Sequence, residues 1–412
     1  MDFLDINLAL LSLTYVVLTA FFAWRGFIAH FVAAFCLLTL PILQILFIYT
    51  NGLDSVFIYN FTPHSLLLST LVLYVVGIIL LINSLIFRRR LLSQSRIRSF
   101  ALSLNSIRLL SILSISLSLV SVYFSNLSVD GGESLAGRGT FTGVGSVMGL
   151  IIVMNFISSR MKQSLLSYIS ILTSFCALLY LSRIFFIVNA LAICAPYLRR
   201  KRASLRIGLL LALVFIAVVF FLYSGEFKHL LGRGFSFEDS VLMMFSYNPF
   251  LDTGSSNLGF SLTYAIGVEA GSSLADCINT LGYKQDYLSA IYSLFLNSLS
   301  VIPGFITRSL GYVNSYSSVC TQPIVQSVLH LLIQSFDALG VIIFALSLSF
   351  FCIQIDSQDS FLNKSFPSSY LFAFLPVFWV RGSLGLSISI SVAVSFSSIL
   401  LSKLLGLKRI LL

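Results

Sequence analysis

The sequence predicts an all-α, polytopic integral membrane protein with about 11 transmembrane helices. Of its 412 residues, 58% are hydrophobic and only 10% are charged, and the mean hydropathy is +0.98. This composition is typical of a membrane protein and not of a soluble domain. A helix needs about 20 apolar residues to cross roughly 30 Å of hydrocarbon, and many stretches meet that length.

The apolar stretches place the spans in order along one membrane domain, 1–412. The predicted spans are 4–24, 27–50, 65–87, 108–125, 143–159, 164–181, 183–198, 207–224, 338–355, 365–380 and 382–402. The chain starts with acidic residues where a cleavable signal peptide would be basic, so no such peptide is expected.

The basic residues are sorted by side of the membrane, since 18 of the 25 fall at alternate ends of the spans. These are Arg25, Arg88, Arg89, Arg90, Arg96, Arg98, Arg108, Arg160, Lys162, Arg199, Arg200, Lys201, Arg202, Arg206, Lys364, Lys403, Lys408 and Arg409. The positive-inside bias makes their side the cytoplasm. The N-terminus then lies outside and the C-terminus is cytoplasmic, and the net charge of +10 does not indicate a nucleic-acid partner.

One long segment, 225–337, falls outside the membrane between the eighth and ninth spans and predicts an outer cap of short helices. Its uncharged stretch 287–307 is long enough to span, but a single extra crossing would spoil the alternation of basic residues. We expect interfacial or re-entrant helices there, and the alternative of two extra crossings would also preserve the alternation. Pro303 and Gly304 end a helix in either arrangement.

Seven basic residues face the other side, and they indicate an anion site. They are Arg138, Arg183, Lys228, Arg233, Lys284, Arg308 and Arg381. Arg183 and Arg381 lie between spans with no hydrophilic loop around them, and a charge at mid-span costs about 2.5–3.5 kcal/mol. One such arginine is readily explained by snorkelling or an ion pair. Five on one face favour a phosphate ligand, which guanidinium groups bind bidentately, and the outer leaflet offers polyprenyl pyrophosphates that carry sugars.

Other chemistries are weakly represented. No nucleotide-binding or serine-hydrolase motif is present. The acidic groups Glu238–Asp239 and Asp130–Glu133 could hold a divalent cation, but acids in loops are more often solvated, so neither a metal nor a cofactor is expected. Cysteines 36, 176, 194 and 352 each lie singly in a span, as small packing residues do. Cys277 and Cys320 could close a disulfide in the cap, and free thiols are the alternative.

Several segments together resemble the Wzy-type O-antigen polymerases, a family of bacterial inner-membrane oligosaccharide repeat-unit polymerases with a GT-C-like fold. The segments are Leu181-Ser-Arg-Ile, the long outer loop, Ile302-Pro-Gly-Phe, Phe336-Asp-Ala-Leu-Gly-Val and Trp379-Val-Arg-Gly-Ser-Leu. The resemblance covers roughly residues 130–400, and it lies in layout more than in strings. Where family members often carry a glutamate, this chain reads His330-Leu-Leu-Ile-Gln-Ser-Phe.

The resemblance implies glycosyl transfer from an undecaprenyl-pyrophosphate-linked oligosaccharide, often with a chain-length regulator membrane protein as partner. It also implies that the outer side, with the N-terminus and the cap 225–337, is the periplasm. It matches the family's outward arginines best to Arg183 and Arg381. The substrate-binding residues would be Arg138, Arg233, Arg308, Lys228 and Tyr264. The general base would come from the cap, where His330 ranks ahead of Glu269 and Asp276 because its reference pKa is near neutral.

Two other functions fit the sequence less well. An O-antigen ligase would have a similar architecture and donor but would transfer the glycan to lipid A core. A lipid-linked oligosaccharide flippase would carry charges along a path inside its spans, and the first eight spans hold almost none.

Overall fold

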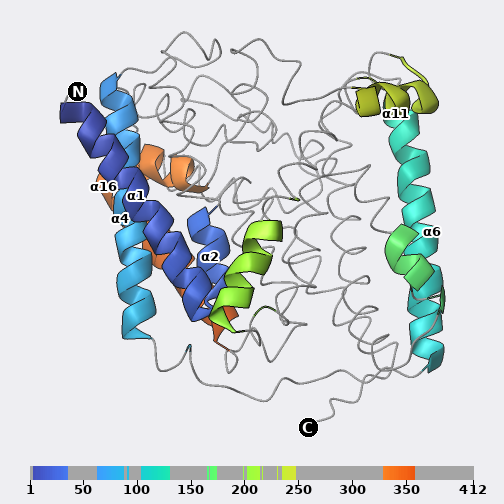
Figure 1. Cartoon of the computed structure of the whole chain (residues 1–412), viewed down its shortest axis with the longest axis horizontal. Helices are drawn as coiled ribbons and strands as arrows, with labels where there is room; N and C mark the ends of the chain where they lie inside the picture. The colour runs from blue at the N-terminus through green and yellow to red at the C-terminus, as the bar shows by residue number, and fades with distance from the viewer. Residues whose placement is uncertain are drawn as a thin grey trace, which may run out of the picture. The chain divides into compact units, whose positions relative to one another are not determined.

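The computed structural model describes residues 3–35, 63–87, 91, 104–129, 165–166, 168–173, 198, 202–213, 216, 230, 234–246 and 328–357. All regular secondary structure in these residues is helical, as Figure 1 shows. Contacts divide the chain into two compact units. The first holds Met1–Ile82, Lys201–Ile291 and Tyr316–Ser347, and the second holds Asn83–Arg200, Tyr292–Ser315 and Leu348–Leu412.

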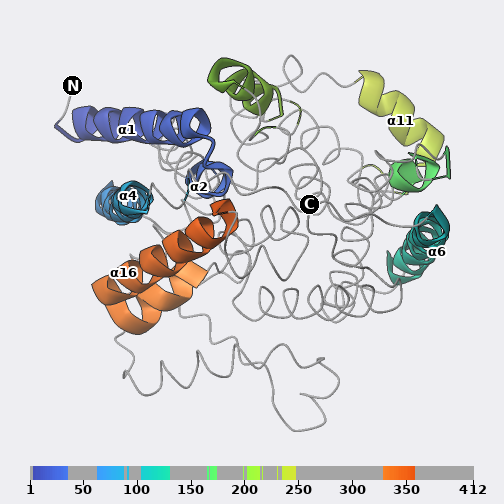
Figure 2. The same ribbon diagram turned by 90° about the horizontal axis from the view of Figure 1, so that it is seen from below.

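The first unit contains the first two helices of the chain, which run antiparallel to each other. Helix α1 (Phe3–Arg25) turns at Gly26 into α2 (Ile28–Ala34), all seven residues of which are buried. The rings of Phe22 and His30 pack with centroids 5.2 Å apart, and Phe27 adds a second contact to His30 at 5.9 Å. Figure 2 shows α1 and α2 beside α4 (Pro63–Ile86). Tyr15 of α1 meets Tyr74 of α4 edge to face, at 6.1 Å.

The exposed face of α4 is apolar and part of its buried face is polar, which is the reverse of a soluble amphipathic helix. Its large exposed side chains repeat every three or four residues and include Leu71, Val75, Ile78, Ile82 and Leu85. Its buried side chains include Ser69, Thr70 and Ser84. Small polar residues that face inward are typical of helices that pack together in a membrane.

Helix α6 (Leu104–Val129) has the same inverted pattern in the second unit. Ser111, Ser114 and Ser118 are buried along one face, and the Ser118 hydroxyl donates to the Ser114 carbonyl at 2.7 Å. The exposed side chains of α6 include Leu109, Ile112, Leu113, Leu119 and Val120. Two helices in different units therefore present hydrocarbon surface outward.

Two described helices are long and apolar enough to cross a membrane, Leu67–Ile86 in α4 and Phe336–Asp356 in α16 (Val328–Asp356). The most apolar window of the first stretch is 39% buried within the structure and that of the second is 56% buried, whereas the core helix of a soluble protein would be mostly buried. Shorter apolar helical stretches are Leu13–Arg25, Ser111–Val120 and Ala203–Leu213.

The predictions for 4–24, 65–87 and 108–125 are confirmed as helices, whose observed ends lie within a few residues of the predicted ends. The prediction for 338–355 is confirmed by the membrane-length stretch Phe336–Asp356, but the helix that contains it begins at Val328, ten residues before the predicted start. Cys352 is a fully buried free thiol, as expected for a packing residue. The total number of spans stays a prediction.

Candidate functional site

Of the predicted site residues, only His330 lies among the residues that the structure describes, and there its backbone alone is described. The other predicted site residues are Arg183, Arg381, Glu269, Asp276, Arg138, Arg233, Arg308, Lys228 and Tyr264, and with the candidate disulfide Cys277–Cys320 they lie outside the described residues. His330 belongs to the first part of α16, where Leu329, Leu332 and Ile333 are buried. The segment just before the predicted ninth span is therefore already helical.

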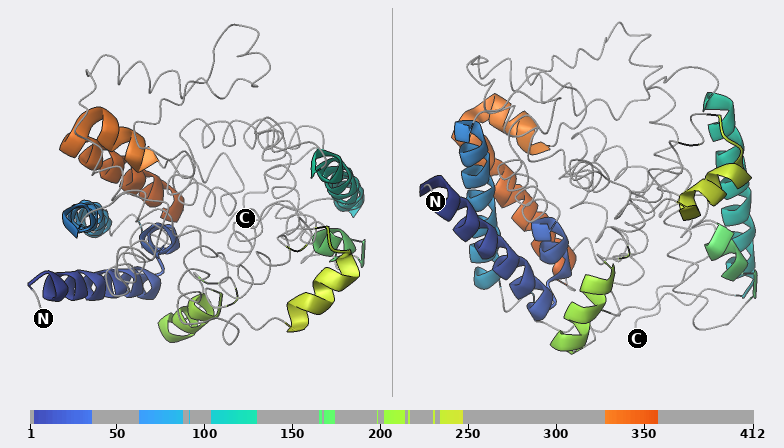
Figure 3. Two further views of the ribbon diagram at one scale, coloured as in Figure 1. Left: turned by 90° about the horizontal axis from the view of Figure 1, so that it is seen from above. Right: turned by 45° about the horizontal axis from the view of Figure 1, so that its top comes forward.

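Helix α16 is broken at Asp337, which has φ 51° and ψ −131°. A residue with a Cβ rarely adopts a positive φ, and the backbone strain of this conformation costs about 1–3 kcal/mol. The break separates the helical stretch 328–336, which carries His330, from the membrane-length stretch that follows. Figure 3 shows the two stretches as ribbons that run in different directions.

Gly340 allows the two parts of α16 to approach each other closely. A Cβ built on Gly340 would overlap the backbone carbonyl of Leu332, and it would lie 2.9 Å from the amide nitrogen of Ile333. No backbone carbonyl can move aside as a flexible side chain can. The segment that carries His330 is thus held against the start of the following helix by backbone contact.

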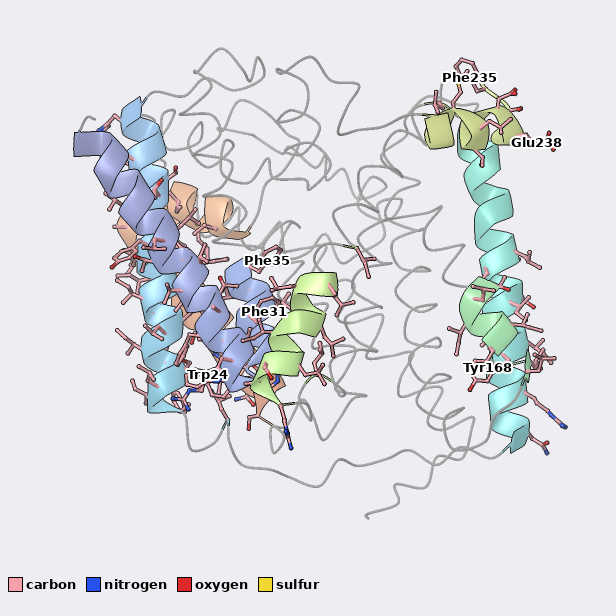
Figure 4. The ribbon with its side chains drawn as sticks, viewed as in Figure 1. Trp24, Phe31, Phe35, Tyr168, Phe235 and Glu238 are labelled. Carbon is pink, nitrogen blue, oxygen red and sulfur yellow. The ribbon has the colours of Figure 1, made fainter. Side chains whose placement is uncertain are left out.

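The acidic pair Glu238–Asp239 has a structural role in α11 (Phe237–Ser246), a ten-residue helix in the predicted cap. The backbone N–H of Asp239 donates to the Ser236 hydroxyl at 3.1 Å, and that hydroxyl donates to the Asp239 carboxylate at 2.6 Å. The first of these bonds is the N-cap bond of a helix, and the second joins the two side chains. Acids in the first turn also favour the helix dipole. Figure 4 shows Glu238 at this helix, with Phe235 just before it. No group of three or more potential metal ligands occurs among the described residues.

The end of α1 is capped by a turn at Gly26. Gly26 has φ 79°, and its N–H donates to the Ala23 carbonyl at 3.2 Å, while the Phe27 N–H donates to the Phe22 carbonyl at 3.0 Å. These two bonds form a Schellman motif, which favours glycine because a side chain resists the left-handed conformation.

Arg206 completes this helix end from the helix Ala203–Leu213, far away in sequence. Its Nη1 donates to the Trp24 carbonyl at 2.9 Å and to the Ala23 carbonyl at 3.3 Å. A cation at a helix C-terminus is stabilised by the helix dipole. The Trp24 carbonyl is one of the last carbonyls of the helix, which lack a partner within the helix, whereas the Ala23 carbonyl also accepts from the Gly26 N–H. A Cβ on Gly26 would lie 2.5 Å from Nη1, so the glycine also makes room for the guanidinium group.

The sequence did not predict the contact of Arg206 with the end of α1, nor the turn at Asp337 in α16. Arg206 counted only as one of the cytoplasmic basic residues, and nothing in its neighbourhood points to α1. We interpreted the segment Phe336-Asp-Ala-Leu-Gly only as the start of a helix. Asp337 and Gly340 lie close together in it, and because both residue types favour turns, they could have indicated one here. Searches with this chain found no matching family model, no matching curated protein and no matching solved structure.

Proposed function

We propose that this protein is a many-span inner-membrane glycosyltransferase that polymerises lipid-linked oligosaccharide repeat units at the periplasmic face. The observation that carries the proposal is the sorting of basic residues, with Arg183 and Arg381 on the side opposite to most of the others. The donor would be a glycan on undecaprenyl pyrophosphate, and no nucleotide sugar would be needed.

The inverted helices support the membrane part of this proposal. Exposed Leu, Ile and Val side chains on α4 and α6 are costly in water but favourable in lipid, where small polar residues mediate helix packing. Together with the membrane-length stretch of α16, they fit a chain that is mainly embedded in the bilayer.

The contact between Arg206 and α1 supports the proposed topology. Arg25 ends α1, and Arg206 lies in the first turn of the helix Ala203–Leu213, just before the predicted span 207–224, which starts at the same side. The bond from Arg206 to the Trp24 carbonyl brings these two ends together, which is consistent with a shared cytoplasmic side.

The proposed reaction joins two lipid-linked glycans. The terminal hydroxyl of the acceptor attacks C1 of the first sugar of the donor, and the bond from C1 to the pyrophosphate oxygen breaks. A base in the cap, His330 in our proposal, takes the hydroxyl proton, and undecaprenyl pyrophosphate leaves with the bonding electron pair. Arg183 and Arg381 would stabilise the growing charge on that leaving group, because guanidinium donors that are already in place need no metal.

The test supplies purified protein with a single synthetic lipid-linked repeat unit and resolves the products by length. The wild type should make a ladder, and Arg183→Ala or Arg381→Ala should reduce elongation by about 100-fold or more. Arg183→Lys should fail similarly, since lysine cannot donate bidentately. Arg108→Ala is the matched control, because it removes an exposed arginine from the predicted cytoplasmic side and should leave the ladder intact.

Other products would identify a different protein. Transfer only after lipid A core is added would identify a ligase. Movement of the lipid-linked unit across vesicles without bond formation would identify a flippase. A normal ladder from both alanine variants would overturn the assignment of the two arginines.

A further inference from the structure

We propose that the cytoplasmic end of α1 binds the headgroup of an anionic phospholipid. The binding surface, here called the α1 rim, consists of Trp24, Arg25 and Arg202 in the first unit. This inference rests on the membrane placement in the proposed function, but it does not depend on glycosyl transfer.

The first argument is the shape of the apolar surface that leads to the rim. Leu13, Val17 and Trp24 are 61%, 60% and 56% exposed, and with Ala20 they form a line along one face of α1. Such a line provides contact for an acyl chain. It ends at Trp24, which Figure 4 places at the end of the helix, and tryptophan favours the depth of lipid headgroups.

The second argument is the charge at the end of that line. The Arg25 guanidinium carbon lies 5.3 Å from the centroid of the Trp24 ring and 5.6 Å from that of Phe21, so the rings hold this cation at the helix end. Arg202 is exposed one turn before Arg206, whose N–H donates to its carbonyl. No acidic residue in the described part of the chain forms an ion pair with Arg25 or Arg202.

The third argument is the role of Arg206. The C-terminus of a helix carries roughly half a negative charge, which would repel a phosphate group. The buried Arg206 guanidinium covers that pole through the Ala23 and Trp24 carbonyls. Among the residues that the structure describes, the charges of Arg25 and Arg202 are then open to an external anion.

A phospholipid fits these features better than free phosphate does. Free phosphate would use the cations but not the apolar line or the exposed indole. In the sequence, Arg202 also ends the basic run Arg199-Arg200-Lys201-Arg202, and basic clusters at the cytoplasmic end of a span attract anionic lipid.

The test uses Trp24 as its own reporter. The chain has two tryptophans, so Trp379→Phe leaves Trp24 alone. The full-length variant is placed in bilayers that contain brominated phosphatidylglycerol or brominated phosphatidylcholine, and quenching of Trp24 gives the relative affinity for the two lipids. We expect a clear preference for phosphatidylglycerol. Arg25→Gln with Arg202→Gln should lower that preference by about 25-fold, at about fivefold for each arginine.

The matched control is Arg98→Gln with Arg108→Gln, which removes two charges from the same predicted side and should change the preference less than twofold. Equal quenching by both lipids in the wild type would overturn the proposal. An equal loss in both double variants would also overturn it, because it would show a general effect of basic charge. Relief of quenching by millimolar inorganic phosphate would assign the site to a free anion instead. If the wild type makes no polymer ladder but still prefers phosphatidylglycerol, that result would count against the proposed function and not against the lipid site.

Discussion

The turn after α1 and the break in α16 solve the same backbone problem in opposite ways. Each needs one residue at positive φ, and the chain supplies Gly26 at φ 79° in one place and Asp337 at φ 51° in the other. At the first turn the glycine is relaxed, the helix carbonyls are bonded, and Arg206 braces the turn from a distant helix. At the second turn a residue with a side chain holds the strained conformation.

The difference lies in where each turn has its glycine. In α16 the glycine is Gly340, three residues beyond the strained position, where it allows backbone contact with Leu332 instead of the turn itself. The first turn is therefore fixed by hydrogen bonds and charge, whereas the second is fixed by close packing. Strain of this kind is commonly kept where a segment must be held for function, and the segment held here carries His330.

The largest effect is expected at the closely packed turn. Gly340→Ala places a Cβ on the Leu332 carbonyl, so we expect a loss of about 3 kcal/mol or more in the free energy of unfolding. The unfolding midpoint in a titration with SDS, followed by circular dichroism of the purified protein, measures this loss.

Gly208→Ala is the matched control for this change. Nothing lies within 4 Å of a Cβ at Gly208, and it also sits in a helix. Its stability should stay the same or rise by up to about 1 kcal/mol, because alanine favours a helix. Wild-type stability in Gly340→Ala would show that the two parts of α16 do not touch at this point.

A smaller effect is expected at the braced turn. Arg206→Met removes two charge-assisted hydrogen bonds and should lower the free energy of unfolding by about 2 kcal/mol. Gly26→Ala should cost about 1–2 kcal/mol through backbone strain, and its Cβ would also displace the Arg206 guanidinium. The double variant should therefore lose about 1 kcal/mol less than the sum of the single losses, as measured in the same titration.

Arg202→Met is the control for Arg206→Met. Because Arg202 is exposed, this change should alter the free energy of unfolding by less than about 0.5 kcal/mol. If the stability losses of the Arg206 and Gly26 variants simply add in the double variant, the Arg206 guanidinium does not contact this turn.

The smallest effect has the opposite sign. Asp337→Gly relieves the strain at positive φ but makes the unfolded chain more flexible, so we expect a net gain of about 1 kcal/mol. Asp337→Ala keeps a Cβ at the strained position and should bring no gain. Thermal unfolding of the two variants side by side separates backbone strain from the loss of the carboxylate, and an equal gain in both would attribute the effect to charge.

The sequence by itself determined the helical class, the position of several helices and the apolar character of their surfaces. These properties depend on residues near one another in the chain, because the length of an apolar run and its helical repeat are local. The helices at 4–24 and 65–87 could be predicted in this way, and so could the buried thiol of Cys352 within its span.

Only the tertiary structure decided which groups meet. Arg206 bonds to carbonyls about 180 residues away in the chain, and Gly340 meets a carbonyl across a turn that the helical repeat alone would not have made. The candidate site shows the same limit, since the sequence names outward arginines and His330 but not the turn that holds the His330 segment. Such contacts depend on how the chain reverses direction, and a single residue at positive φ is enough to change that.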